Sequence, residues 1–149
     1  MKLRHIFSSL ALALVALHLS SGVVCAQSAS SSDTFIYGGN IYSHKASEWD
    51  LANTPLWDAA REEPPLSLRK AVEIARGSLR RYVKKADDMS VERIELKQLG
   101  VDKWIYQIAF FCWEGVCEDE AGRYFRIFLK MDGSVIEPEI KPATTESNR

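Results

Sequence analysis

Two cysteines, Cys112 and Cys117, are the residues whose types and spacing could do chemistry in this sequence. A structural zinc ion takes four ligands, and after the N-terminal apolar segment the chain adds one histidine, His44, far away in the sequence. A thiol oxidoreductase usually places Cys-x-x-Cys at a helix start, where the helix dipole lowers a thiol pKa. Here four residues separate the cysteines at the end of an expected strand. This disfavours zinc and leaves a thiol redox enzyme using Cys112 and Cys117 as an alternative.

A disulfide is the interpretation that the spacing favours. Two thiols of an exported protein normally oxidise, and strand residues that flank a short loop have Cα atoms about 4.5–5.5 Å apart, which is within disulfide range. A Cys112–Cys117 disulfide would hold Trp113 on a closed loop. Trp113 is then either a contact residue for a partner or a cap on the core.

The remaining candidates for catalysis or metal binding lack partners at the required spacing. The sequence has no G-x-S-x-G, H-E-x-x-H or phosphate-loop motif, and His44 has no evident nucleophile beside it. The acidic residues that follow Trp113 do not have the spacing of an EF-hand calcium loop. We therefore expect no enzyme activity, no cofactor and no metal.

The N-terminus predicts export. A basic start is followed by an apolar run, Ile6–Leu19, of about 14 residues, shorter than the roughly 20 of a membrane-spanning helix. Small residues then lead to Ala26, which is typical of a signal peptide over residues 1–26 and of a periplasmic or secreted protein. A retained anchor and a lipid-anchored Cys25 stay open. No transmembrane segment is expected in the mature chain.

The rest of the chain divides by composition. Residues 27–34 are small and polar and predict a flexible linker. Residues 35–65 are rich in aromatics without a sustained period, and we expect an extended arm, anchored by its tryptophans, that lies against the domain or binds a partner. A globular domain is expected over residues 66–138, followed by a polar, frayed tail over residues 139–149.

Periodicity predicts an α+β domain. Ser67 is a natural N-cap for a helix over residues 68–86, whose apolar stripe recurs at three- and four-residue steps and consists of Leu68, Ala71, Val72, Ala75, Leu79, Tyr82 and Val83. Strands follow over residues 91–99, 103–112 and 123–131, with a short one over 134–137 after the Asp132-Gly133 turn. We expect one amphipathic helix packed on a three- to four-stranded antiparallel meander.

Charge excludes one class of partner. The formal net charge of −1 becomes −3 without Lys2 and Arg4, and neither value indicates a nucleic-acid partner. The helix has a basic face that could contact anionic surfaces. A solvated face is favoured, because four of these cations lie near the helix C-terminus, where the helix dipole attracts them. The face consists of Arg69, Lys70, Arg76, Arg80, Arg81, Lys84 and Lys85.

Residues 66–137 resemble a PepSY-type domain. The resemblance rests on Ala71, Ile74 and Ala75 in the helix, on the W-x-Y-x-I pattern of residues 104–108, and on the Asp132-Gly133 turn. The cysteine loop and the aromatic arm depart from the plain family pattern. PepSY domains are small exported or membrane-attached modules, some in propeptides of thermolysin-type metalloproteases. The resemblance therefore implies a binding or protease-inhibitory role and carries over no catalytic residues.

The middle strand, residues 103–112, is apolar on both faces, although one helix can cover only one of them. We therefore expect a partner surface on the second face, at Ile105, Ala109 and Phe111, continued by Trp113. The aromatic arm could instead cover this face. The function predicted from sequence is an exported, non-enzymatic binding module of unknown partner, and a self-associating structural envelope protein is the first alternative.

Overall fold

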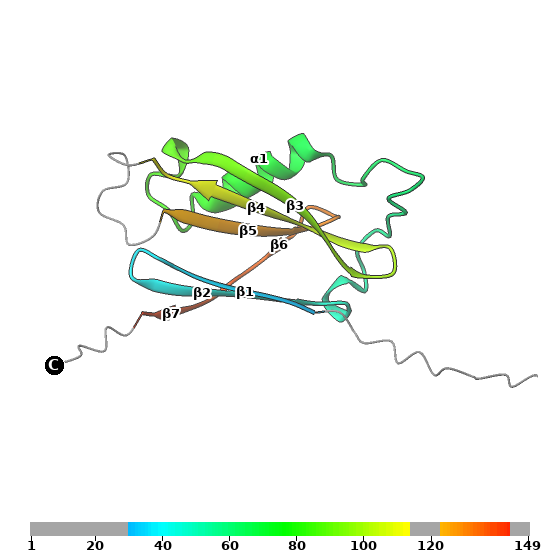
Figure 1. Ribbon diagram of the computed structural model, residues 1–149, viewed down its shortest axis with the longest axis horizontal. Helices are drawn as coiled ribbons and strands as arrows, with labels where there is room; N and C mark the ends of the chain where they lie inside the picture. The colour runs from blue at the N-terminus through cyan, green and yellow to red at the C-terminus, as the bar shows by residue number, and fades with distance from the viewer. Residues whose placement is uncertain (1–29, 114–122, 144–149) are drawn as a thin grey trace, which may run out of the picture.

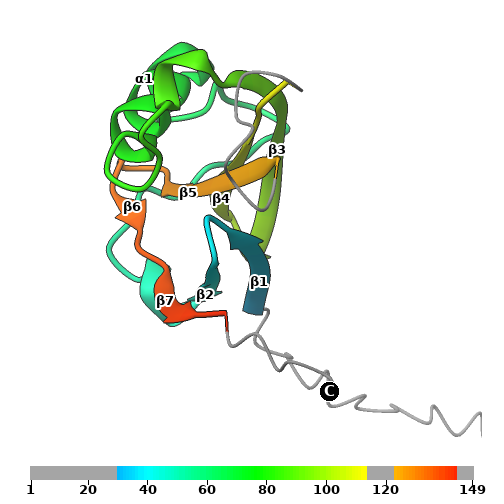
Figure 2. The ribbon, with the colours of Figure 1, turned by 90° about the vertical axis from the view of Figure 1, so that its left-hand side faces the viewer.

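The computed structural model describes residues 30–113 and 123–143. This part of the chain forms three layers: a helix, a four-stranded sheet and a three-stranded sheet (Figures 1 and 2). The α+β class and the antiparallel meander beside one helix are confirmed over these residues. The third layer was not predicted.

The three-stranded sheet corrects three sequence-based boundaries. Strand β1 (Ser30–Tyr37) occupies most of the expected linker, and it pairs antiparallel with β2 (Asn40–Ser47) from the expected extended arm. Gly38 and Gly39 both have positive φ, 53° and 74°, and thereby meet the requirement of a tight hairpin turn. Strand β7 (Glu139–Pro142), from the expected frayed tail, completes the sheet by pairing with β2.

Helix α1 (Leu68–Leu79) begins where predicted and ends seven residues early. The Ser67 hydroxyl accepts a hydrogen bond from the Lys70 backbone N–H at 3.4 Å, which confirms the N-cap. After Leu79 the chain turns back through η2 (Ala86–Asp88), and Val83 becomes buried outside the helix. In the sequence, the three- and four-residue spacing of apolar residues continues past Leu79, because the segment that turns back also contributes apolar residues to the core.

The four-stranded sheet has the predicted meander order, β3 (Ser90–Gly100), β4 (Lys103–Phe111), β5 (Tyr124–Lys130) and β6 (Val135–Ile136). The β5–β6 turn is the predicted Asp132-Gly133 turn. Gly133 has φ 88°, and the Asp132 carboxylate accepts a hydrogen bond from the Ser134 backbone N–H at 2.8 Å.

The core lies on both faces of β4. Tyr106, Ile108 and Phe110 face the helix side, whereas Ile105 packs on the opposite side with Leu51 and other residues of a second buried cluster. Leu51 belongs to η1 (Trp49–Leu51), which follows β2 directly. The aromatic segment therefore covers the second face, and it does so as a paired sheet and a short helix rather than as an extended arm.

The predicted tryptophan anchors of the arm behave differently from each other. Trp57 is buried, packs against Trp104 at 5.3 Å between ring centroids, and donates its ring N–H to the Glu62 carbonyl at 2.9 Å. Trp49 is 82% exposed and anchors nothing. One of the two tryptophans therefore has the expected role.

Candidate functional site

The end of strand β4 brings the cysteine region together with two further aromatic residues. Cys112 follows β4 directly, is buried, and donates its backbone N–H to the Arg123 carbonyl at 2.9 Å. This bond extends the β4–β5 ladder by one step beyond the Phe111–Tyr124 register pair. Cys117 lies outside the described residues, so the Cys112–Cys117 disulfide stays a prediction.

Phe111, Trp113 and Tyr124 form a surface cluster at this end of the sheet, here called the aromatic cluster. The Phe111 ring lies 5.2 Å from the Trp113 ring, edge-on, and 4.9 Å from the Tyr124 ring. Trp113 is 63% exposed and Tyr124 is 42% exposed, whereas Phe111 is half-buried beneath them. Trp113 therefore does not cap the core, and two large rings are presented to solvent on a hydrogen-bonded strand pair.

The structure separates the other predicted contact residues from this cluster. Ile105 and Ala109 are buried between the two sheets, so they cannot contact a partner. The sequence left open what covers this face, and the structure shows that β2 and η1 do so, with Ala46 and Leu51 packed in one cluster with Ile105. Tyr124 is a member that the sequence analysis missed. The register of the predicted strands could have found it, because it lies opposite Phe111.

His44 is buried in the interface between the sheets. Its Nδ1 lies 3.0 Å from the Ile136 carbonyl oxygen, its Nε2 has no partner, and its ring packs on Phe35 and Phe128 at 5.9 and 4.5 Å. Burial lowers the pKa of His44, and the Ile136 carbonyl and the Asp33 charge oppose this shift only in part. The lowered pKa favours the neutral ring, which packs between the aromatic side chains of the two sheets.

An ion pair beside His44 joins the two sheets. The Arg126 guanidinium on β5 donates to both carboxylate oxygens of Asp33 on β1, at 2.9 and 3.0 Å, and lies over the Phe35 ring at 5.6 Å. The two charged side chains are half-buried. A charge pair of this kind fixes the position of the β1–β2 hairpin on the face of the four-stranded sheet that lies away from the helix.

The end of the helix is linked to the β6–β7 connection by a second polar group. Glu137 accepts hydrogen bonds from the Tyr82 hydroxyl and from Arg81, the latter at 2.8 Å. Burial, with the neighbouring Glu137 carboxylate, raises the pKa of Tyr82 to about 12. The Tyr82 ring also stacks on Phe125 at 5.4 Å. These contacts hold the segment after the helix against β5 and the β6–β7 connection.

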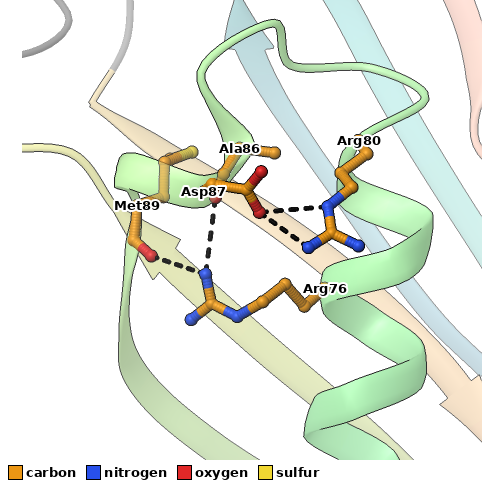
Figure 3. Close-up of polar contacts among 5 residues, drawn as sticks. All are labelled: Arg76, Arg80, Ala86, Asp87 and Met89. Atoms are coloured by element: carbon orange, nitrogen blue, oxygen red, sulfur yellow. Dashed lines mark hydrogen bonds and ion pairs between the residues drawn. The ribbon is translucent and has the colours of Figure 1, made fainter.

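Several cations of the basic face bond to neighbouring groups, as Figure 3 shows for Arg76 and Arg80. Arg76 donates to the Met89 carbonyl at 3.0 Å and more weakly to that of Ala86, while Arg80 makes two bonds to the Asp87 carboxylate, at 3.0 and 2.8 Å. These bonds hold the segment after α1 against the helix. The observation favours the solvated-face interpretation over an anion-binding surface.

Neither a metal centre nor a membrane span is found within residues 30–113 and 123–143. No group of three or more histidine, cysteine or acidic residues is gathered there as a metal site would require. The same residues contain no helix long and apolar enough to cross a bilayer. No protein family, curated protein or solved structure matches this chain.

Proposed function

We propose that this chain is an exported, non-enzymatic binding module that holds a protein partner through the aromatic cluster. The observation that carries the proposal is the exposure of Trp113 and Tyr124, whose rings both contact Phe111. Tryptophan and tyrosine dominate binding hot spots because they bury a large rigid area and keep a polar group for the rim. The β4–β5 pairing supplies the rigidity.

The non-enzymatic part of the proposal rests on the surroundings of the candidate reactive groups. A reactive cysteine is partly exposed in an electropositive environment, whereas Cys112 is buried. His44 is buried between apolar rings. Both features weigh against the thiol redox alternative. A disulfide from Cys112 to Cys117 would instead tie down the loop after Trp113.

Export and the PepSY-like character rest on the sequence. The pattern of residues 1–26 supports export, and the helix-then-meander order of residues 66–137 supports the likeness to PepSY domains. The PepSY resemblance suggests a protease as one class of partner. The three-stranded sheet of β1, β2 and β7 lies outside that resemblance.

The test is partner capture from the exported fraction with the immobilised protein, followed by mass spectrometry. The variant Trp113→Ala/Tyr124→Ser removes the two exposed rings. The matched control, Trp49→Ala, removes an even more exposed tryptophan, which lies next to Glu48 near the start of β4, whereas Trp113 follows its end. A partner retained by the control and lost by the double variant supports the proposal. A partner retained by both variants removes the aromatic cluster from consideration.

The same capture experiment distinguishes binding of a different protein from self-association. Recovery of the chain itself as the captured protein, with sedimentation that depends on concentration, would favour the structural envelope alternative. A captured protease is then assayed with increasing amounts of this protein. Inhibition that the double variant loses would extend the proposal to a protease-inhibitory role.

A further inference from the structure

Three large apolar side chains are exposed at the end of the molecule opposite the aromatic cluster. They are Trp49 in η1, Leu56 in the following loop and Val101 in the β3–β4 turn, exposed to 82%, 61% and 80%. We call these three residues the apolar pole. They come from three separate segments, so their exposure is not the property of one irregular loop.

Contacts between those segments place them at one end of the fold. The Glu48 side chain lies so close to Gly100 that a Cβ there would approach it to 2.9 Å. The Lys103 ammonium reaches the Glu48 carboxylate at 3.7 Å, and the Trp57 backbone N–H donates to the Asp102 carbonyl at 2.8 Å. Each member of the apolar pole is a direct neighbour in sequence of one of these contacting residues.

The described chain also begins at this end. Ser30, the first residue of β1, pairs with Ser47, and Ser47 is bonded through its N–H and hydroxyl to Asp50 of η1 at 2.8 Å. The start of β1, η1 and the β3–β4 turn therefore lie together (Figure 1). Residues 20–29 separate the apolar run over residues 6–19 from Ser30. In a chain that retains this run as an anchor, the segment with affinity for a bilayer therefore leads into the end of the fold that carries Trp49.

We propose that the apolar pole rests on a lipid bilayer surface. A tryptophan at a protein tip suits the interface, since its ring is apolar and its N–H stays with the headgroups. Leu56 and Val101 on neighbouring turns add apolar area that water would otherwise surround. The charged residues next to Trp49 and Val101 in the sequence, Glu48, Asp50 and Asp102, are acidic, so the attraction is apolar rather than ionic and does not need anionic lipid.

The test measures the local environment of Trp49 in the full chain, recovered as its host processes it. Two variants each leave one exposed tryptophan: Trp113→Phe keeps Trp49, and Trp49→Phe keeps Trp113. The buried Trp57 and half-buried Trp104 are common to both. Each variant is mixed with phosphatidylcholine vesicles, with and without brominated acyl chains, which quench a tryptophan only when it enters the bilayer.

The expected result is quenching of Trp113→Phe and none beyond background for Trp49→Phe. Leu56→Ser with Val101→Ser, added to Trp113→Phe, should lower the fraction of quenched Trp49 about tenfold in partition, equivalent to about 1.4 kcal/mol. All substituted positions are exposed or on turns, so the fold is kept.

Equal quenching of both variants overturns the proposal, because the N-terminal segment would then hold the protein in no fixed orientation. Absence of quenching overturns it as well, and so does quenching that appears only with phosphatidylglycerol. Loss of a captured protein partner by Trp49→Ala, but not by Trp113→Ala, would assign the pole to a protein contact instead. The proposed partner site depends on Trp113 alone, so either proposal can fail without the other.

Discussion

Replacing Phe125 with alanine tests whether the β1–β2 hairpin is part of the stable fold. The Phe125 ring on β5 is fully buried and makes edge-on contacts with Phe35, Tyr37 and Tyr42 at centroid distances of 5.1, 5.3 and 4.9 Å. It also stacks on Tyr82 after the helix at 5.4 Å. One side chain therefore joins both strands of the hairpin to the four-stranded sheet and to the end of the helix.

The size of the loss follows from these contacts. A buried Phe→Ala change costs about 3–5 kcal/mol through lost transfer free energy and the cavity that remains. Aromatic pairs contribute about 0.5–1.5 kcal/mol each beyond their buried area, and four such pairs disappear here. We therefore expect the upper part of that range, about 4–5 kcal/mol. A domain of this size has a total stability of only about 5–15 kcal/mol.

Urea unfolding followed by tryptophan fluorescence measures this change, since Trp57 and Trp104 are packed in the core. The matched control is Phe111→Ala on the neighbouring strand, whose ring is half-buried and contacts the exposed rings of Trp113 and Tyr124. It should cost about 1–2 kcal/mol. A loss at Phe125 no larger than the loss at Phe111 would refute the packing of the hairpin on the sheet.

Three further predictions concern the polar groups between the layers. Because burial lowers the pKa of His44, the stability that its neutral ring contributes is present above the ordinary pKa of about 6.5 and is lost as pH falls through 6.5 toward the lower folded pKa. His44→Gln should thus flatten the dependence of the urea midpoint on pH between about pH 7 and pH 5, and an unchanged slope would contradict this assignment. Asp33→Asn leaves Arg126 half-buried without its carboxylate and should lower the free energy of unfolding by about 1–2 kcal/mol in the same assay. The exposed Glu73→Gln should change it by close to nothing. Equal losses would mean that the Asp33–Arg126 pair stabilises the fold no more than an exposed ion pair does. Because burial raises the pKa of Tyr82 to about 12, its ring NMR signals should stay constant through its ordinary pKa of about 10 and move only near pH 12, and a midpoint at the ordinary value would show that the ring is solvated.

The four-stranded meander and the start of the helix could be predicted because their signals are local. Ser67 supplies an oxygen to the first helical turn, and Asp132-Gly133 supplies the backbone geometry of a tight turn. The alternation of side chains along β4 correctly predicted which residues lie on each face of the strand, with Tyr106 on the helix side and Ile105 on the other. Each of these features depends on residues within a few positions of one another.

The candidate site could be predicted only in part. Trp113 was found because it stands between two cysteines, and its exposure agrees with a contact role. Tyr124 was missed because its place beside Phe111 depends on the register of two strands. Ile105 and Ala109 were wrongly offered as contact residues because the sequence left open what covers the second sheet face.

The amino-acid sequence alone determined the amphipathic helix, the meander and the turns between its strands. Only the tertiary structure decided that residues 30–47 and 139–142 form a second sheet. The reason is that this sheet places two ionisable groups, Asp33 and His44, among its inward-facing aromatic residues. Asp33 is half-buried against Arg126, 93 residues away, and the buried His44 has its Nδ1 at the Ile136 carbonyl, 92 residues away. The alternation of apolar and polar residues could not predict these strands, because polar groups on their inner face are stabilised by partners far away in the sequence.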